Sequence, residues 1–278
     1  MRANAAQHLL RDQIRHLYEE REALAIAQWV VEDLTGTTRA DRLLCDPELT
    51  EEQTEIFERS SQQLLAGVPM QYVLGYAMFM GLRFSVNQHV LIPRPETEEL
   101  VQWLLESTPK DAKILDIGSG SGCIAICISR QRPDASVTSI DVSADALAVA
   151  KENAKRLNAD VQWVEGDFLD ISVQEQLDHP TMIISNPPYI PSSDKDTMAA
   201  HVVDHEPHVA LFVPDNDALK FYRAIITYGS RYGITEILFE THYQLAQQVA
   251  ALGEASGYRA EVRVDMAGNE RMVRLIRQ

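Results

Sequence analysis

From residue 113 to the end of the chain, short apolar segments of strand length alternate with segments of helical periodicity. This alternation predicts an α/β fold with a doubly wound, mostly parallel sheet, because a crossover helix must join each pair of parallel strands. The expected strands are 114–117, 136–140, 161–164, 182–185, 236–239, 260–264 and 272–276. The expected helices are 123–130, 144–157, 217–228 and 243–252. A turn at 267–269 separates the last two strands, so we expect a closing hairpin that makes the seven-stranded sheet mixed.

The first 65 residues have a different, helical pattern. Apolar residues recur at helical spacing at positions 10, 14 and 17 and at 24, 27, 31 and 34. Thr50 is a candidate N-cap for a further helix, and Gly67-Val68-Pro69 ends the segment. Phe79 and Phe84 flank a tight turn at Gly81, which predicts a β-hairpin. We therefore expect a small helical-bundle domain at 1–75, a β-hairpin linker at 76–95 and the α/β domain at 96–278.

The formal net charge of −16 argues against a protein that mainly grips a phosphate backbone, because such proteins usually carry a basic face. It favours a protein or small-molecule partner. The three cysteines form no CxxC pair and are too few for a disulfide framework. No signal peptide or membrane-spanning run is evident, so we expect a soluble cytoplasmic protein with no membrane partner.

A glycine-rich turn follows the first expected strand of the α/β domain. Gly118, Ser119, Gly120, Ser121 and Gly122 give the pattern GxGxG at the point where a strand passes into a helix. The dinucleotide fingerprint GxGxxG would need glycine where Cys123 stands, and no Gly-Lys-Ser/Thr follows for a P-loop. Glycines here let a ligand approach the backbone closely, although they could also serve only close strand–helix packing.

Acidic residues follow the next two expected strands. Asp141 could accept hydrogen bonds from both hydroxyls of a ribose, and Asp167 could accept one from an adenine amine. Phe168 could lie against the adenine ring. Each acid alone could also be an ordinary solvated strand end. Together they border the crevice where open sheets bind ligands, and a nucleoside without a diphosphate fits them best, which predicts S-adenosylmethionine.

The tetrapeptide Asn186-Pro187-Pro188-Tyr189 follows the fourth expected strand. Its two prolines remove two N–H donors, so nearby carbonyl oxygens can stand unpaired. The Asn186 side-chain oxygen and the Pro187 carbonyl could accept both hydrogens of an NH2 group, while Tyr189 stacks on the planar system that carries it. Accepting both hydrogens concentrates electron density on the nitrogen and directs it at a sulfonium methyl group. We therefore expect transfer to a planar nitrogen, although a proline-rich loop that only caps a strand remains an alternative.

At these residues the chain resembles the release factor glutamine methyltransferases, the PrmC/HemK family, over nearly its whole length. The shared segments are Gly67-Val68-Pro69, Phe79-Met80-Gly81, the IPRPETE run from Ile92 to Glu98, the glycine turn, Asn186 to Tyr189, Glu206-Pro207 and Asp265 to Arg271. The resemblance implies a Rossmann-like class I methyltransferase domain preceded by a helical domain that recognises the substrate. It implies methylation of the glutamine amide in the Gly-Gly-Gln loop of peptide chain release factors, with S-adenosylhomocysteine as the product.

The resemblance also implies residue roles. The turn Gly118 to Gly122, Asp141, Phe168 and Asn186 would contact the cofactor, and Asn186 to Tyr189 would hold the glutamine. Arg94, Glu96 and Thr97 would border the pocket. This chain departs from the family pattern at Thr241-His242, where Ile-Gly is frequent, and in the loop 213–217, which lacks a common glycine.

Two rival functions remain open at this point. The tetrapeptide also occurs in enzymes that methylate a flipped adenine, for which we would expect a basic surface. A translation regulator that binds the cofactor without turnover is the second rival. His201, His205 and His208 are irregularly spaced, so we expect no metal. We expect a monomer that does not bind nucleic acid directly.

Overall fold

The computed structural model describes residues 1–278, apart from the side chains of Thr197 and Ala200, and the chain folds into two compact units. The first unit comprises Met1–Tyr76 and Ala199–His205, and the second comprises Ala77–Met198 and Glu206–Gln278. Most of the segment that we expected to link two domains is therefore part of the second unit. Each unit is described by itself below.

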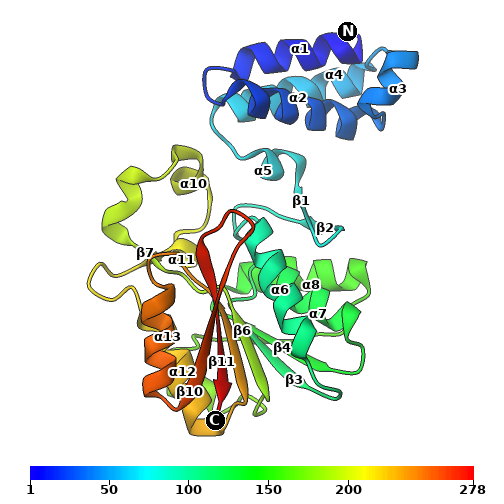
Figure 1. Cartoon of the computed structure of the whole chain (residues 1–278). Coiled ribbons are helices and arrows are strands. Elements are labelled where there is room, and N and C mark those ends of the chain that lie inside the picture. Colours follow the sequence, from blue (N-terminus) through cyan, green and yellow to red (C-terminus); the bar gives the residue numbers. More distant parts are fainter. The chain divides into compact units, whose positions relative to one another are not determined.

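The first unit is helical (Figure 1). Its helices are α1 (Ala3–Ile14), α2 (Glu20–Thr35), α3 (Arg39–Leu44), α4 (Glu51–Leu65), α5 (Met70–Leu74) and α10 (Ala200–His205). Gly36 ends α2 in the left-handed conformation at φ +66°, and Thr50 begins α4 with a capping box that it shares with Gln53. Leu10, Ile14 and the apolar face of α2 form the core, whereas Leu17 lies beyond the end of α1 and is exposed.

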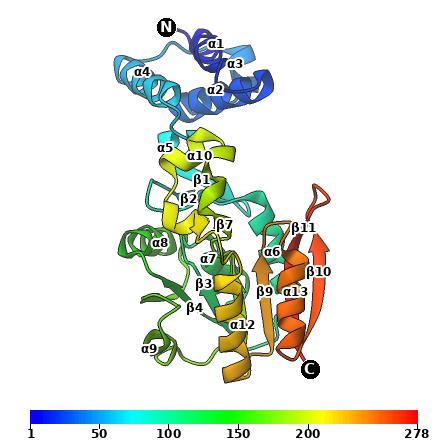
Figure 2. The ribbon, with the colours of Figure 1, turned by 90° about the vertical axis from the view of Figure 1, so that its left-hand side faces the viewer.

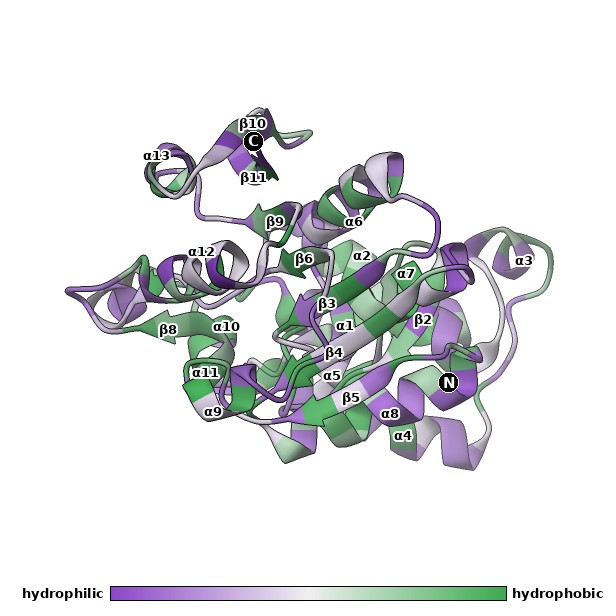
Figure 3. Ribbon diagram, turned by 90° about the horizontal axis from the view of Figure 1, so that it is seen from below, coloured by the Kyte–Doolittle hydropathy of each residue, from purple (hydrophilic) through white to green (hydrophobic). Residues whose placement is uncertain are grey.

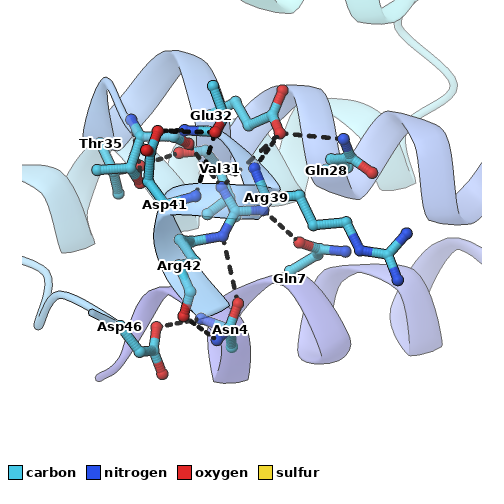
Figure 4. Close-up of polar contacts among 12 residues, drawn as sticks. Asn4, Gln7, Gln28, Val31, Glu32, Thr35, Arg39, Asp41, Arg42 and Asp46 are labelled. Carbon is cyan, nitrogen blue, oxygen red and sulfur yellow. Dashed lines mark hydrogen bonds and ion pairs between the residues drawn. The ribbon is translucent and has the colours of Figure 1, made fainter. Parts of the chain in front are cut away.

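A buried arginine joins three parts of this unit (Figure 4). Arg42 of α3 is only 2% exposed, and its guanidinium donates to Gln7 Oε1 at 2.7 Å, Asn4 Oδ1 at 3.2 Å and the Thr37 carbonyl at 2.7 Å. The carboxylate of Glu32 lies 4.0 Å from the same group. A buried charge is tolerated only when its donors are satisfied, so this network fixes α3 against α1 and the end of α2.

The second unit is built on a seven-stranded sheet in the order β10-β11-β9-β6-β3-β4-β5. Its strands are β3 (Lys113–Ile117), β4 (Ser136–Asp141), β5 (Gln162–Glu165), β6 (Met182–Ser185), β9 (Glu236–Glu240), β10 (Tyr258–Val264) and β11 (Glu270–Arg277). Neighbouring strands from β5 to β9 are parallel, and β11 is antiparallel to both β9 and β10. The expected mixed sheet and its closing hairpin are confirmed.

Helices cover both faces of this sheet, as the view along it shows (Figure 3). On one face pack α6 (Pro95–Ser107), α7 (Cys123–Gln131) and α8 (Ala144–Leu157), and on the other α12 (Lys220–Tyr232) and α13 (Ala246–Ala255) (Figure 2). Because successive strand residues point to opposite faces, Ile114 and Ile184 belong to the first core while Leu115 and Ile183 belong to the second. The near-continuous apolar strands reflect burial on both faces.

A small hairpin precedes the sheet. It consists of β1 (Tyr76–Phe79) and β2 (Leu82–Ser85), with Met80 and Gly81 both at positive φ in the turn. The Met80 backbone N–H donates to Glu98 Oε1 at 2.8 Å, which ties the turn to α6. The remaining short elements are α9 (Ile171–Gln174), β7 (Ile190–Pro191), η1 (Ser192–Thr197), α11 (His208–Leu211) and β8 (Phe212–Val213). In the described chain, no helix combines the length and apolar character needed to cross a bilayer.

Candidate active site

The glycine turn begins where β3 ends. The Gly118 backbone N–H donates to the Ile140 carbonyl at 2.9 Å, and the Gly120 N–H donates to Asp141 Oδ2 at the same distance. Gly118 and Gly120 have φ values of +91° and +51°, which favour glycine. The turn is therefore shaped by contacts with the end of the neighbouring strand β4.

A buried polar cluster lies beneath the turn. Ser139 Oγ donates to Asp116 Oδ2 at 2.7 Å and lies 2.7 Å from Ser119 Oγ. Burial raises the pKa of Asp116 to about 7, while the Ser139 hydrogen bond lowers it and the charge of Asp141 adds to the rise. The side chain of Ser119 thus points into the sheet.

A cavity of about 290 Å³ opens at the carboxyl ends of β3, β4 and β6. Eight of the residues that we predicted for the site line it: Gly118, Gly120, Asp141, Asp167, Phe168, Asn186, Pro187 and Pro188. The lining also includes His89, Leu91, Val142, Ser143, Val209 and Phe221, which sequence reasoning did not single out. Residues far apart in the sequence therefore meet at one crevice, as expected for an open parallel sheet.

The other three residues of the turn, Ser119, Ser121 and Gly122, do not line the cavity. Ser119 and Ser121 are buried and do not line the cavity. A Cβ atom on Gly122 would lie 2.9 Å from Ile126 and 3.0 Å from Trp163, whereas a Cβ on Gly120 would meet nothing within 4 Å. Gly122 consequently serves close strand–helix packing, and Gly120 keeps open space beside the cavity.

The two carboxylates of the cavity lining, Asp141 and Asp167, are partly engaged with the backbone. Asp141 Oδ1 accepts from the Ser143 N–H at 2.9 Å, and Asp167 Oδ1 accepts from the Leu169 N–H at 2.9 Å. A carboxylate has about four lone-pair positions, so both acids retain acceptor capacity for a ligand. Phe168 is buried, and its ring packs edge-on against Tyr228 at 5.3 Å, so only part of this ring reaches the cavity.

Asn186 is held by Thr97, which is itself hydrogen-bonded to Glu240. Its Nδ2 donates to Thr97 Oγ1 at 3.3 Å, and Thr97 Oγ1 donates to Glu240 Oε2 at 2.6 Å. Among the described residues, no protein group donates a hydrogen bond to Asn186 Oδ1. Thr97, which we expected at the border of the pocket, instead lies behind Asn186 and is 3% exposed.

Tyr189 lies away from the cavity lining, among charged groups. Burial raises the pKa of its phenol to about 12, and Glu240 adds to the rise while Arg271 opposes it. Its ring lies 6.1 Å from that of His242, at an angle of 46°. The tetrapeptide therefore has two sides, with Asn186 to Pro188 on the cavity and Tyr189 beside Glu240 and Arg271.

Arg94 and Glu96 do not line the cavity either. Arg94 Nη2 donates to Glu206 Oε1 at 2.5 Å, and Glu206 Oε2 accepts from the Ile92 N–H at 3.1 Å. The Glu206 side chain is 1% exposed. This carboxylate joins the IPRPETE segment to Pro207 and to Val209 of α11, both of which line the cavity.

The size of the cavity and its acceptor groups fit S-adenosylmethionine. Its volume is near the lower end of the range for small-molecule pockets, about 300–1,000 Å³, and its lining is mostly apolar with a few polar groups. Open space stands where a Cβ of Gly120 would be, and Asp141 and Asp167 offer acceptors at neighbouring strand ends. No loop of the phosphate-binding type accompanies them. The fold and this crevice define a class I, S-adenosylmethionine-dependent methyltransferase.

Known proteins support a narrower assignment. Residues 95–210 match the family model "Methyltransferase small domain", and residues 6–75 match "PrmC N-terminal domain". A release factor glutamine methyltransferase of Flavobacterium psychrophilum is 37% identical over 270 residues, covering 93% of each chain. One of Streptococcus pneumoniae is 40% identical over 261 residues, covering 92% of this chain and 91% of the relative. A crystal structure of a methyltransferase from Pyrococcus furiosus superposes with a TM-score of 0.53 at 14% identity, covering 82% of this chain and 98% of that chain.

The chain belongs to the release factor glutamine methyltransferase family. S-adenosylmethionine is accordingly its methyl donor.

Glu240 and Glu206 are two further polar residues, outside the cavity lining, to which sequence reasoning assigned no role. Each had a signal in the sequence. Glu240 is a carboxylate at the end of the apolar run 237–239, and Glu206 precedes a proline in a segment shared with the family. Their partners Thr97 and Arg94 are over one hundred positions away, so neither pairing follows from local spacing.

Proposed function

We propose that this protein methylates the side-chain amide nitrogen of the glutamine in the Gly-Gly-Gln loop of peptide chain release factors. One observation carries the proposal. Asn186 lines the cavity with its Nδ2 engaged by Thr97, which leaves Oδ1 as an acceptor beside Pro187. An acceptor pair of this kind is complementary to a planar NH2 group, and the family to which the chain belongs supplies the identity of that group.

The chain's own residues orient the acceptor nitrogen. Asn186 Oδ1 and the Pro187 carbonyl accept its two hydrogens, and neither Pro187 nor Pro188 has an N–H that could compete for these acceptor oxygens. Bound S-adenosylmethionine supplies the electrophilic methyl group. An amide nitrogen has a delocalised lone pair, so acceptors fixed on both hydrogens favour the geometry in which its face is exposed. Tyr189 lies outside the cavity lining, so in this proposal its ring stacks on the amide plane from the side of the tetrapeptide where Glu240 and Arg271 lie.

The cofactor is held by the backbone of the turn Gly118 to Gly122 and by Asp141, Asp167 and Phe168. Gly118 and Gly120 allow close approach, and Asp141 accepts from the ribose hydroxyls. Asn186 contacts both cofactor and substrate because it lies at the end of β6 in the cavity wall. Arg94, Glu96 and Thr97 act behind the pocket: Thr97 holds Asn186, and Arg94 holds Glu206.

The helical domain at 1–75 recognises the remainder of the release factor in this proposal. The net charge of −16 supports a protein partner over direct binding of nucleic acid. We propose that the protein acts as a cytoplasmic monomer and does not associate with membranes.

The test uses purified protein, labelled S-adenosylmethionine and a purified release factor. We expect label on the wild-type release factor and none on a release factor whose loop glutamine is replaced by alanine. Asn186→Ala should lose transfer while the fold remains, whereas Asn216→Ala, in an exposed loop outside the cavity, should retain it. Label that survives the loop substitution, or that appears only on DNA containing adenine, contradicts the proposal.

A further inference from the structure

Three side chains from separate parts of the second unit, Glu240, Thr97 and Asn186, form a continuous series of hydrogen bonds, which we call the relay. Glu240 ends β9, Thr97 lies in the first turn of α6, and Asn186 follows β6. The distances are 2.6 Å from Thr97 Oγ1 to Glu240 Oε2 and 3.3 Å from Asn186 Nδ2 to Thr97 Oγ1. Glu240 and Thr97 are 2% and 3% exposed, so water does not compete for these groups.

The number of available protons fixes which group donates and which accepts in each hydrogen bond of the relay. A carboxylate only accepts hydrogen bonds, so the single proton of the Thr97 hydroxyl is donated to Glu240. The oxygen of Thr97 is then left with lone pairs alone and must receive a donor from Asn186. That donor is the NH2 group, which places the amide oxygen of Asn186 on the opposite edge of its side chain. Ionised Glu240 therefore sets which face of the Asn186 amide points away from Thr97.

We propose that Glu240 is a positioning residue that acts through Thr97 to hold the Asn186 amide with its oxygen toward the acceptor nitrogen. The identity of that acceptor rests on the proposed function, whereas the orientation of Asn186 does not. Glu240 itself does not line the cavity and does not touch the reacting atoms.

The surroundings of Glu240 couple this orientation to pH. The groups that face it are Arg271 on β11, Arg94 and Glu96 at the start of α6, Tyr189 after β6, and Tyr222 on α12, whose hydroxyl donates to the Glu240 carbonyl at 3.1 Å. Burial raises the pKa of Glu240 to about 7, and the Thr97 hydrogen bond and Arg271 lower it. A protonated Glu240 can donate to Thr97, which frees the Thr97 hydroxyl to donate to Asn186 and lets the amide turn over.

Three variants separate positioning from simple packing. Thr97→Val keeps the shape of the side chain and removes the hydroxyl, Thr97→Ser keeps the hydroxyl, and Glu240→Gln replaces the obligate acceptor with an amide. We expect Thr97→Val to lower kcat about 10- to 100-fold, less than the loss of a polar group that itself contacts the reacting atoms, because Thr97 acts through Asn186. Thr97→Ser should restore most of the rate. The Kd for S-adenosylmethionine should change less than about threefold in all three, because the substitutions leave Asp141, Asp167 and Phe168, which also hold the cofactor, unaltered.

The pH profile gives a readout that a packing role would not move. In the wild-type protein kcat should rise as pH increases through about 7, because ionised Glu240 is the form that orients Asn186. The rise should persist in Thr97→Ser and disappear in Thr97→Val. An unchanged pH profile and an unchanged kcat in Thr97→Val overturn the proposal.

An acceptor-independent measurement keeps this test separate from that of the proposed function. In ¹⁵N-labelled protein, one side-chain amide proton of Asn186 should be protected from exchange in the wild type and in Thr97→Ser. The protection should be lost in Thr97→Val and reduced in Glu240→Gln. If the release factor is not methylated, the proposed function fails while protected Asn186 protons still support the relay. Equal protection in all four proteins overturns the relay whichever acceptor is used. Should Thr97→Val fail to fold, Glu240→Gln carries the same comparison.

Discussion

The Asp141 carboxylate accepts a hydrogen bond from the Gly120 backbone at 2.9 Å and thereby joins the end of β4 to the turn after β3. Its other oxygen accepts from the Ser143 N–H, which starts α8. One side chain thus shapes the turn, the helix start and the wall of the cavity. A residue that is fixed on both sides in this way presents its remaining lone pairs to a ligand without further ordering.

Asp141→Ala should weaken binding of S-adenosylmethionine by about 10- to 150-fold, because hydrogen bonds to a charged group are worth about 1.5–3 kcal/mol. Asp141→Asn, which keeps one acceptor oxygen, should lose less. Isothermal titration calorimetry measures both. Glu165→Ala is the matched control, since Glu165 is an exposed carboxylate paired with Asp141 in the β4–β5 register but does not line the cavity. Equal losses for Asp141→Ala and Glu165→Ala would show that Asp141 has no special role.

The glycines of the turn should respond differently to alanine. Gly122→Ala places a Cβ within 2.9–3.1 Å of Ile126, Trp163 and Ala150, so it should lower the free energy of unfolding by about 2–4 kcal/mol, combining overpacking with strain at positive φ. Gly120→Ala meets no neighbouring atom and should cost only about 1 kcal/mol of stability. It should nevertheless weaken cofactor binding, because its methyl group enters the space beside the cavity. Urea unfolding and calorimetry on the two variants separate these effects, and a reversed order of stability would contradict the assignment.

Much of the fold could be predicted because its signals are local. Residues 182–185 and 144–157 form the strand and helix that their patterns indicate, since buried parallel strands are nearly all apolar and helices keep a 3.6-residue period. The short helices α3 and α5 and the elements between 190 and 213 were not foreseen. Each is at most six residues long, so tertiary contacts rather than sequence periodicity determine its conformation.

The site could be predicted only to the level of its segments. Strand-end position places Asp141 and Asn186 at one crevice, because the carboxyl ends of parallel strands meet there. Spacing alone cannot tell that Ser119 turns inward to Ser139 while Gly120 faces the cavity. It also cannot pair Thr97 with Glu240, which lie 143 positions apart. These details depend on packing that no short pattern encodes.

Arg42→Ala should destabilise the helical unit by about 3–5 kcal/mol, as expected when one member of a buried polar network is removed. The substitution removes the donor of Gln7, which is buried, and of Asn4 and the Thr37 carbonyl, which are half-buried. Circular dichroism during urea unfolding of the whole protein measures the loss. Arg39→Ala provides the control, because Arg39 is exposed in the same helix, and its cost should stay within about 0.5 kcal/mol. Similar costs for the two arginines would rule out a structural role for the network.

Asp116 should make stability depend on pH in a direction opposite to that of most carboxylates. Burial raises the pKa of Asp116 to about 7 in the folded protein, from an ordinary value of 3.8. Between these values the folded state binds the extra proton, so the Asp116 contribution to stability is present at low pH and is lost as pH rises toward 7. Asp116→Asn cannot ionise. The free energy of unfolding of Asp116→Asn minus that of the wild type should therefore increase from pH 5 to pH 7, by at most about 1.4 kcal/mol per pH unit, and level off above.

Asp170→Asn is the opposite-sign control, because the Ser172 hydrogen bonds hold the pKa of Asp170 below its usual range. The free energy of unfolding of Asp170→Asn minus that of the wild type should change only in more acidic solution, below the usual pKa of an aspartate. A flat difference for Asp116→Asn between pH 5 and pH 8 would mean that Asp116 is ionised in the folded protein throughout, and the buried cluster beneath the glycine turn would then carry a full negative charge.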